Sequence, residues 1–285
     1  MTPTLQKKQP VSTHCGIMLE NIPDFDLDQT LNCGQCFRWD RQPDGSYIGI
    51  SQNHSCHISQ KGSTFYFEGT TLEEYENFWK DYFDLTRDYG KIKSLLSQNP
   101  VLRSACAYAP GIRVLRQEPW EALCSFIISQ NNNVGRIKGI VARLCETFGD
   151  PLDGGYFSFP GPERLAELTP QDLAPLRCGF RARYIIDAAQ KVASGQVDLE
   201  SLKVLPLPQA REVLTAITGV GNKVADCALL YGCGRIECFP VDVWIKRAME
   251  RLFPKGLPKY MLPWAGIAQQ YIFHYVRTCP GSLEG

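Results

Sequence analysis

The spacing of apolar and polar positions changes near residue 69. Before it, short apolar runs alternate with turn residues, a pattern typical of strands in an antiparallel meander. A Gln-Pro-Asp-Gly stretch at 42–45 marks one of the turns. Strands are predicted over residues 36–39, 47–50, 56–58 and 65–67.

After Gly69, apolar residues recur every three or four positions, which indicates helices from there to Phe273. A first helix is predicted through Phe83. The helices after residue 115 are predicted over about 119–128, 134–148, 181–193, 209–217, 223–230, 243–253 and 263–276. Pro- and Gly-rich joints separate them at 150–162, 205–208 and 254–258.

The simplest division is an α+β one, with a β-rich unit in residues 1–115 and a helical unit in residues 116–285. Apolar residues make up 44% of the 285 residues and charged residues 21%, which are globular values. We find neither an apolar run of bilayer length nor the apolar core of a signal peptide. We therefore expect no membrane association and a cytoplasmic protein.

Charge identifies no partner by itself, because thirty basic residues balance thirty acidic ones. Residues 101–285 hold twenty-one basic and seventeen acidic residues, a slight lean toward a polyanion. The twelve cysteines include one CxxC motif, Cys33 to Cys36, without a second motif at zinc-site spacing. We therefore expect no metal. A redox pair would need a βαβ setting, whereas the flanking pattern is a meander.

The stretch from residue 214 to 242 is the most informative. Gly219-Val220-Gly221 predicts a tight turn between two short helices. Glycines allow a close approach, and free N–H groups at the start of the second helix suit a phosphate. A plain helix–helix connection is the alternative, because such turns commonly contain glycine.

Lys223 lies in the first turn of that second helix, where the macrodipole disfavours a cation. A positive helix end favours the unprotonated amine that Schiff-base chemistry requires. Cys227 lies four residues on, on the same face. The alternative is a solvated surface lysine.

Asp242 follows Pro240-Val241 and precedes a strongly amphipathic helix. It is a natural N-cap, and a capping role alone is one reading. A carboxylate near the amine would also stabilise positive charge that develops on a sugar ring. Lys223 and Asp242 together therefore suggest amine attack at an anomeric carbon.

Four ordered motifs resemble one enzyme family over about residues 15–278. The hairpin with GNKVADC and the downstream PVDV run resemble the helix-hairpin-helix DNA glycosylases. The segments GQCFRW (34–39), SFIISQNNN (125–133) and GFRARY (179–184) narrow the resemblance to the 8-oxoguanine DNA glycosylase/AP lyases. The resemblance implies an N-terminal antiparallel sheet like that of TATA-binding protein, with flanking helices, followed by an all-α helix-hairpin-helix domain.

By this resemblance, Lys223 attacks the deoxyribose C1′, displaces the damaged base and forms the imine from which β-elimination cuts the strand. Asp242 then stabilises the oxocarbenium-like transition state. The base must first be flipped out of the duplex and held between flat walls.

Four residues are implied to bind the flipped base. Cys227 and Phe273 sandwich it, Gln269 bonds its Watson–Crick edge, and the Gly34 carbonyl accepts the N7–H that guanine lacks. The physical basis for the last role is sound, because guanine N7 is an acceptor and two facing acceptors repel. Core packing is the alternative for Phe273, since its spacing also fits a buried stripe.

Further positions are implied to contact DNA. Asn131 fills the vacated space and contacts the orphaned cytosine, assisted by Arg136 and Arg181, while Phe180 wedges the duplex open. A capping cluster is the alternative for the three asparagines. The resemblance adds Gly219, Gly221 and Trp244 to the DNA contacts.

Three features of the sequence differ from those of better-known members of these families. Trp244 stands where they carry a histidine and cannot form the same phosphate hydrogen bond, and Phe180 stands where they carry a tyrosine. The four-cysteine iron–sulfur loop of the endonuclease III branch is missing, with Cys279 alone after residue 240. We therefore expect no cofactor.

The expected function is bifunctional base-excision repair by a monomer that removes 8-oxoguanine opposite cytosine from double-stranded DNA. A monofunctional alkyl-base glycosylase would keep the aspartate and lack the lysine. A non-catalytic DNA-binding module would use the hairpin only to grip phosphates. These two readings, and a redox protein using Cys33 and Cys36, are the alternatives.

Overall fold

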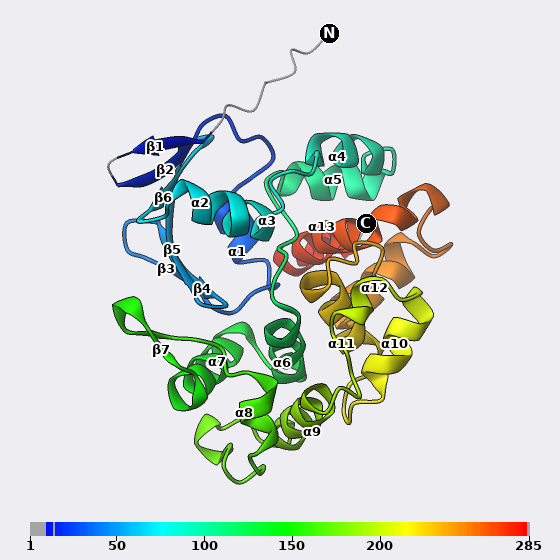
Figure 1. Ribbon diagram of the computed structural model, residues 1–285. Helices are drawn as coiled ribbons and strands as arrows, with labels where there is room; N and C mark the ends of the chain where they lie inside the picture. Colours follow the sequence, from blue (N-terminus) through cyan, green and yellow to red (C-terminus); the bar gives the residue numbers. More distant parts are fainter. Residues whose placement is uncertain (1–9, 14, 284–285) are drawn as a thin grey trace.

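The N-terminal part forms a six-stranded sheet in the order β1-β2-β6-β5-β4-β3, with every neighbouring pair antiparallel. The computed structural model describes residues 10–13 and 15–283. Figure 1 shows the sheet beside a larger group of helices. The strands are β1 (Val11–Thr13), β2 (Gly16–Leu19), β3 (Trp39–Arg41), β4 (Tyr47–Ser51), β5 (His54–Lys61) and β6 (Thr64–Glu68).

The predicted meander is confirmed for three of its four strands, and β1 and β2 extend it. The prediction of a strand over residues 36–39 is wrong, because β3 begins at Trp39 and the preceding residues form a loop. Phe37 in this loop turns away from the sheet and packs edge-on against Phe126 of the helical part, with ring centroids 5.8 Å apart. Packing between the two parts of the chain therefore overrides the local strand pattern.

Aromatic rings fill the space between the sheet and the helix predicted through Phe83. That helix is made of α2 (Leu72–Glu74), a π-helical turn (Tyr75–Trp79) and α3 (Lys80–Tyr82). Trp39 donates a hydrogen bond from Nε1 to the Tyr82 hydroxyl at 2.7 Å. A Cβ on Gly49 would lie 2.1 Å from the Trp39 ring, so the close approach of β4 requires glycine there.

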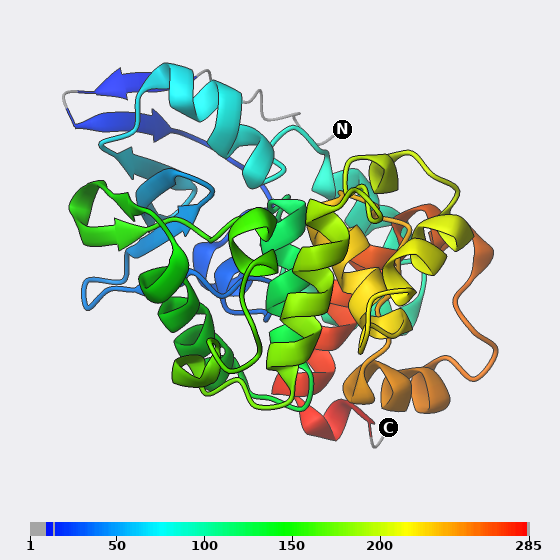
Figure 2. The same ribbon diagram turned by 60° about the horizontal axis from the view of Figure 1, so that its bottom comes forward.

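In the helical part, α11, α7 and α9 pack against α6, in which every residue from Trp120 to Ile128 is buried. Figures 1 and 2 show α6 in the middle of the molecule. A two-stranded hairpin of β7 (Pro151–Leu152) and β8 (Tyr156–Phe157) interrupts the helices. The helices are α1 (Leu27–Leu31), α4 (Tyr89–Leu96), α5 (Pro100–Tyr108), α6 (Pro119–Ser129), α7 (Val134–Phe148), α8 (Pro162–Ala166), α9 (Arg181–Ala193), α10 (Leu207–Thr215), α11 (Asn222–Cys227), α12 (Val243–Leu252) and α13 (Ala265–Thr278).

The predicted helices are present, and those over 134–148 and 181–193 match α7 and α9 to the residue. The others differ at their ends for identifiable reasons. Pro208 occupies the first turn of α10, which therefore begins before the predicted 209. Pro263 lies inside a 3₁₀ turn (Lys259–Trp264), and α13 begins only after it. The hairpin within the joint 150–162 was not predicted.

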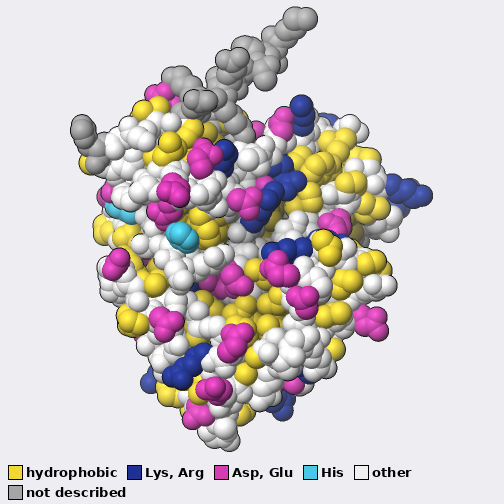
Figure 3. Space-filling model, in the orientation of Figure 1, with side chains coloured by type: hydrophobic (Ala, Val, Ile, Leu, Met, Phe, Trp, Pro, Cys, Tyr) yellow, Lys and Arg dark blue, Asp and Glu magenta, His cyan; other side chains and the backbone are white. Residues whose placement is uncertain are grey.

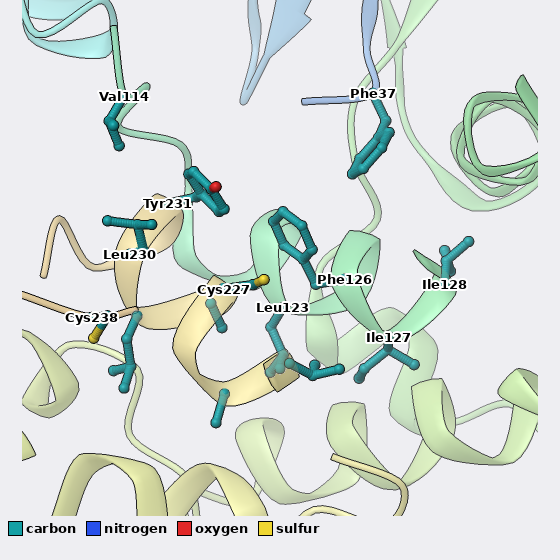
Figure 4. Packing of buried hydrophobic residues seen from close by; sticks show 14 of the residues in the cluster. Phe37, Val114, Leu123, Phe126, Ile127, Ile128, Cys227, Leu230, Tyr231 and Cys238 are labelled. Carbon is teal, nitrogen blue, oxygen red and sulfur yellow. The ribbon is translucent and has the colours of Figure 1, made fainter. Parts of the chain in front are cut away.

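Two hydrophobic cores divide the chain differently from the predicted boundary at residue 115. One core lies between the sheet and the helices that cover it. The other is helical and includes α4, α5 and the loop residues Cys33 and Phe37 from the N-terminal part. In Figure 4, Phe37, Phe126 and Tyr231 lie together in this second core, and Phe126 stacks on Tyr231 with ring centroids 5.1 Å apart. The two parts of the chain are therefore interlocked.

A buried ion pair also joins the loop before β3 to α6. Arg38 and Glu121 lie 3.2 Å apart, with side chains 7% and 8% exposed. Burial raises the pKa of the Glu121 carboxyl to about 7, although Arg38 opposes the shift. Arg38 also donates a hydrogen bond to the carbonyl of Phe157. No helix in the described part of the chain is long and apolar enough to cross a bilayer.

We expect Glu121 to make stability depend on pH. Its pKa is about 7 in the folded chain and near 4.5 without the protein environment, so the folded state binds more protons between these values. The free energy of unfolding should therefore fall as pH rises from about 4.5 to 7. Glu121→Gln cannot titrate and should flatten this dependence in urea titrations at half-unit pH steps.

The exposed Glu163→Gln variant serves as the control and should keep the wild-type dependence. An equally steep pH dependence in Glu121→Gln would contradict the assignment.

Candidate active site

A cleft of about 800 Å³ opens where the helical part meets the loop before β3. The cleft lies among the end of α6, the first turns of α11 and α12, and the last turns of α13. The loop that follows α6, with Asn131, Asn132 and Asn133, also lines it and is called the asparagine loop below. On the face shown in Figure 3, acidic and basic side chains are interspersed. The groups that line the cleft include Gly34, Ser129, Asn131, Lys223, Asp242, Trp244, Phe273 and Arg277.

The predicted hairpin is present between α10 and α11. Gly219 has φ +79°, and a Cβ there would lie 2.4 Å from the ring of Tyr184, so this corner requires glycine. Gly221 is the N-cap of α11 and has no side chain to cap it. The first N–H groups of α11 therefore remain available at an exposed helix end, as a phosphate site requires.

Lys223 is half-buried and is not a freely solvated lysine. Its Nζ donates a hydrogen bond to Ser129 Oγ at 3.2 Å and lies 5.1 Å from the centroid of the Phe126 ring. Ser129 in turn donates to the Phe126 carbonyl at 2.8 Å. The end of α6 therefore holds the amine at the wall of the cleft.

Cys227 lies one turn beyond Lys223 and is 3% exposed. Burial raises the pKa of its thiol to about 11, while the charge of Lys223 acts in the opposite direction. Cys227 is therefore a neutral thiol at physiological pH. A neutral, polarisable sulfur can pack against a flat ring.

Asp242 caps α12, because its Oδ1 accepts a hydrogen bond from the N–H of Ile245 at 2.8 Å. The same residue lines the cleft together with Lys223. The two readings of Asp242 are therefore compatible, since the cap fixes the orientation of a carboxylate that is open to the cleft.

The backbone at Gly34, with φ +83°, is fixed from both sides. The buried amide of Gln35 donates to the carbonyls of Thr30 at 2.9 Å and Arg113 at 2.7 Å, and it accepts from the N–H of Leu115 at 2.9 Å. On the other side, a hydrogen bond of 3.0 Å joins the Cys33 carbonyl to α13, and its donor is the side chain of Gln270. The position of Gly34 therefore depends on both parts of the chain.

Gln269 and Phe273 share one face of α13, as their spacing predicts. Phe273 is half-buried and lines the cleft. Gln269 is 4% exposed, and its Oε1 is buried without a hydrogen-bond partner in the described structure. An unpaired buried oxygen is costly, and a donor from a bound molecule would relieve that cost.

Asn131, Arg136 and Arg181, which the resemblance places near the orphaned cytosine, do not all lie at the surface. Asn131 is exposed, with φ +47°, and Arg136 is exposed on α7. Arg181 is 3% exposed and donates to the carbonyls of Gln130, Asn131 and Cys178. In this structure Arg181 therefore holds the backbone of the asparagine loop from the buried side.

Phe180 is 45% exposed, and its ring contacts the guanidinium of Arg181 and the ring of Tyr184. It does not line the cleft. Trp244 lines the cleft from the first turn of α12, and the guanidinium of Arg247 lies 5.5 Å from its ring.

Sequence reasoning missed Ser129, Gln270 and Arg277. Ser129 and Gln270 act through contacts that join distant segments, for which the sequence contains no signal. Arg277 could have been found, because it continues the spacing of four that relates Gln269 to Phe273.

The cysteines give no support to a metal or redox centre. The twelve thiols are free, and the described residues contain no group of three or more His, Cys, Asp or Glu side chains that could hold a metal ion. Burial raises the pKa of Cys33 to about 12 and raises that of Cys36 as well. Buried protonated thiols react slowly, which disfavours the redox alternative.

Comparisons with known proteins agree with this architecture. Residues 124–259 match the HhH-GPD superfamily of base excision DNA repair proteins, and residues 17–123 match the N-terminal domain of 8-oxoguanine DNA glycosylase. A solved structure of MBOgg1 with a low-affinity DNA ligand superposes with a TM-score of 0.90 at 42% identity, covering 95% of this chain and 99% of that one. The fold and the cleft thus define a member of the HhH-GPD superfamily.

Two further relatives narrow the assignment. The 8-oxoguanine glycosylase/lyase of Clostridium acetobutylicum, solved with double-stranded DNA containing cytosine opposite 8-oxoguanine, has a TM-score of 0.89 at 36% identity, covering 96% of this chain and 99% of that one. The N-glycosylase/DNA lyase of Saccharomyces cerevisiae is 41% identical over 156 residues, which cover 50% of this chain and 42% of that protein. The chain belongs to the 8-oxoguanine DNA glycosylase family.

A second curated relative, the N-glycosylase/DNA lyase OGG1 of Arabidopsis thaliana, is 31% identical over 237 residues, which cover 78% of this chain and 65% of that protein. The chain thus spans less than two thirds of the length of both curated relatives. The predicted α+β fold, a sheet followed by a helical HhH-GPD domain, is confirmed.

We expect Gln35→Ala to loosen the junction that positions Gly34. The substitution leaves the N–H of Leu115 and the carbonyl of Arg113 buried without partners, and it removes one of the two donors to the Thr30 carbonyl. The free energy of unfolding should fall by about 2–4 kcal/mol, as measured by urea denaturation. The exposed Gln196→Ala is the matched control. A loss no larger than that of the control would show that Gln35 does not hold the junction.

Proposed function

We propose that this protein removes 8-oxoguanine paired with cytosine from duplex DNA and then cleaves the abasic strand. The observation that carries the proposal is that Lys223 and Asp242 line one cleft, each at the start of a helix, with the glycine hairpin beside Lys223. The names of the relatives agree, since they are glycosylase/lyases.

The reaction starts with the unprotonated Nζ of Lys223, which forms a bond to C1′ of the flipped nucleotide. The glycosidic bond breaks, and its electron pair leaves with the base, which takes up a proton. Asp242 stabilises the positive charge on the sugar as this bond breaks. The bound amine then loses a proton, its nitrogen forms a C=N bond to C1′ as the C1′–O4′ bond breaks, and the ring oxygen takes up a proton. Loss of a C2′ proton breaks the C3′–O bond and cuts the strand.

Four groups would bind the lesion. Cys227 and Phe273 would form the walls, a role that a neutral buried thiol and an open aromatic face can fill. The unpaired oxygen of Gln269 would accept from the Watson–Crick edge. The carbonyl of Gly34 would accept N7–H, the donor that 8-oxoguanine has and guanine lacks.

The DNA duplex would lie across the mouth of the cleft. The N–H groups at Gly219 and Gly221 would bind phosphates, and exposed Phe180 would wedge between base pairs. Asn131 and Arg136 would face the cytosine. Arg181 would act through the loop that it supports, and Trp244 would contact DNA without adding charge. The enzyme would act as a monomer without a cofactor.

Replacing the amine should abolish both chemical steps. Lys223→Gln is expected to release no base and to form no borohydride-trapped complex with an 8-oxoguanine:cytosine duplex, because a carboxamide cannot form an imine. DNA binding should remain. The assay is gel analysis of trapped protein–DNA complexes beside an undamaged duplex.

Trapping that persists in Lys223→Gln would place the nucleophile elsewhere. Base release by the wild type without trapping would indicate a monofunctional glycosylase. Absence of both, with retained binding, would favour a DNA-binding module.

Asp242→Asn should separate the two roles of this residue. Asparagine caps a helix as well as aspartate does, so stability should be unchanged. The single-turnover rate of base excision is expected to fall about 10²–10⁴-fold, because the carboxylate charge is lost. An unchanged rate would reduce Asp242 to a cap.

A further inference from the structure

Arg277 is a cation of the cleft to which neither the motifs nor the proposed reaction assigns a role. The charged side chains that line the cleft are Lys223, Asp242 and Arg277. Lys223 and Asp242 are assigned to the reaction. Arg277 lies at the end of α13, on the far side of Phe273 from Gln269 along the helix.

The guanidinium of Arg277 is held in place without being neutralised. Its Cζ lies 5.5 Å from the centroid of the Phe273 ring, and Nη1 lies 3.1 Å from the point where a Cβ on Gly34 would stand. Arg277 makes no hydrogen bond or ion pair with residues 10–13 or 15–283. A guanidinium stacked on an aromatic face keeps its N–H donors free for a planar or tetrahedral anion.

The position along α13 indicates which part of a nucleotide this guanidinium reaches. Gln269, Phe273 and Arg277 follow each other at intervals of four, and burial decreases from Gln269 to the two half-buried residues. Eight residues of helix advance about 12 Å. If Gln269 meets the base edge and Phe273 the ring, then Arg277 lies at the level of the sugar and phosphate.

We propose that Arg277 binds a backbone phosphate of the flipped nucleotide. This inference rests on the proposed function. The guanidinium would form two parallel hydrogen bonds to the phosphate oxygens while it remains stacked on Phe273. One face of α13 would then contact three parts of the flipped nucleotide: Gln269 the edge of the base, Phe273 the ring of the base, and Arg277 the phosphate. Trp244 lines the same cleft without a charge, and Arg277 adds a cation to that cleft beside Lys223.

The test measures how DNA binding depends on salt. All variants carry Lys223→Gln so that binding is separated from chemistry, and fluorescence anisotropy gives Kd for 8-oxoguanine:cytosine and undamaged duplexes between 50 and 200 mM KCl. Each lost phosphate contact lowers the slope of log K against log salt by about 0.9. The protein that keeps Arg277 should bind the lesion duplex more tightly than Arg277→Met. The ratio of the two Kd values should shrink about 3.5-fold between 50 and 200 mM KCl.

Two further variants make the result specific. Arg277→Lys keeps the charge and should retain most of the slope. Lys61→Met is a matched control, because Lys61 also lies over an aromatic ring, that of Tyr66, on the sheet and outside the cleft. It removes the same net charge and should leave the slope unchanged.

An unchanged slope in Arg277→Met would overturn the phosphate contact. An unchanged slope together with a lost preference for the lesion would also overturn it, and would assign Arg277 to the base instead. If the Lys223→Gln protein does not prefer the lesion duplex at all, the proposed function fails and the inference fails with it. A retained lesion preference with an unaltered slope would refute the Arg277 inference alone.

Discussion

The buried side-chain amide of Gln35 is the interaction on which the site depends. It joins two backbone segments, α1 at Thr30 and the stretch before α6 at Arg113 and Leu115, through hydrogen bonds. The carbonyl of Gln35 also accepts from the Gln117 side chain at 2.7 Å, just before α6 begins. These bonds are shielded from water, so each is costly to leave unmade. They fix α1, the loop before β3 and the segment that leads into α6 relative to one another, and Gly34 of this loop lines the cleft.

The cations of the cleft are held mainly by aromatic rings and neutral groups. Lys223 lies over Phe126 and donates to a serine, and Arg277 lies over Phe273. Ring faces attract cations without cancelling their charge, whereas a carboxylate partner would cancel it. The chain has zero net charge, so this local arrangement allows a neutral protein to present positive charge to a polyanion at one place.

The sequence predicts much of this protein, and the exceptions share a cause. The start and end of α7 follow from its asparagine N-cap and its regular apolar stripe, both of which are local. The Lys223 hairpin is also local, and so is the cap at Asp242. The loop at 36–38, the Ser129 contact and the buried Arg181 depend on segments far apart in the chain. Single-residue patterns cannot reveal such pairings, because each partner alone resembles an ordinary surface residue.

The buried guanidinium of Arg181 has a consequence for the entropy of binding. It holds the carbonyls of Gln130 and Asn131 and leaves the Asn131 side chain exposed on a backbone of positive φ. A loop that had to adopt this left-handed conformation on meeting its partner would lose conformational freedom at that moment, at a cost to affinity. Here the ordering occurs when the chain folds. The cost of ordering the backbone at Asn131 is therefore met in folding, and it does not reduce the affinity for a partner that binds the loop in this conformation.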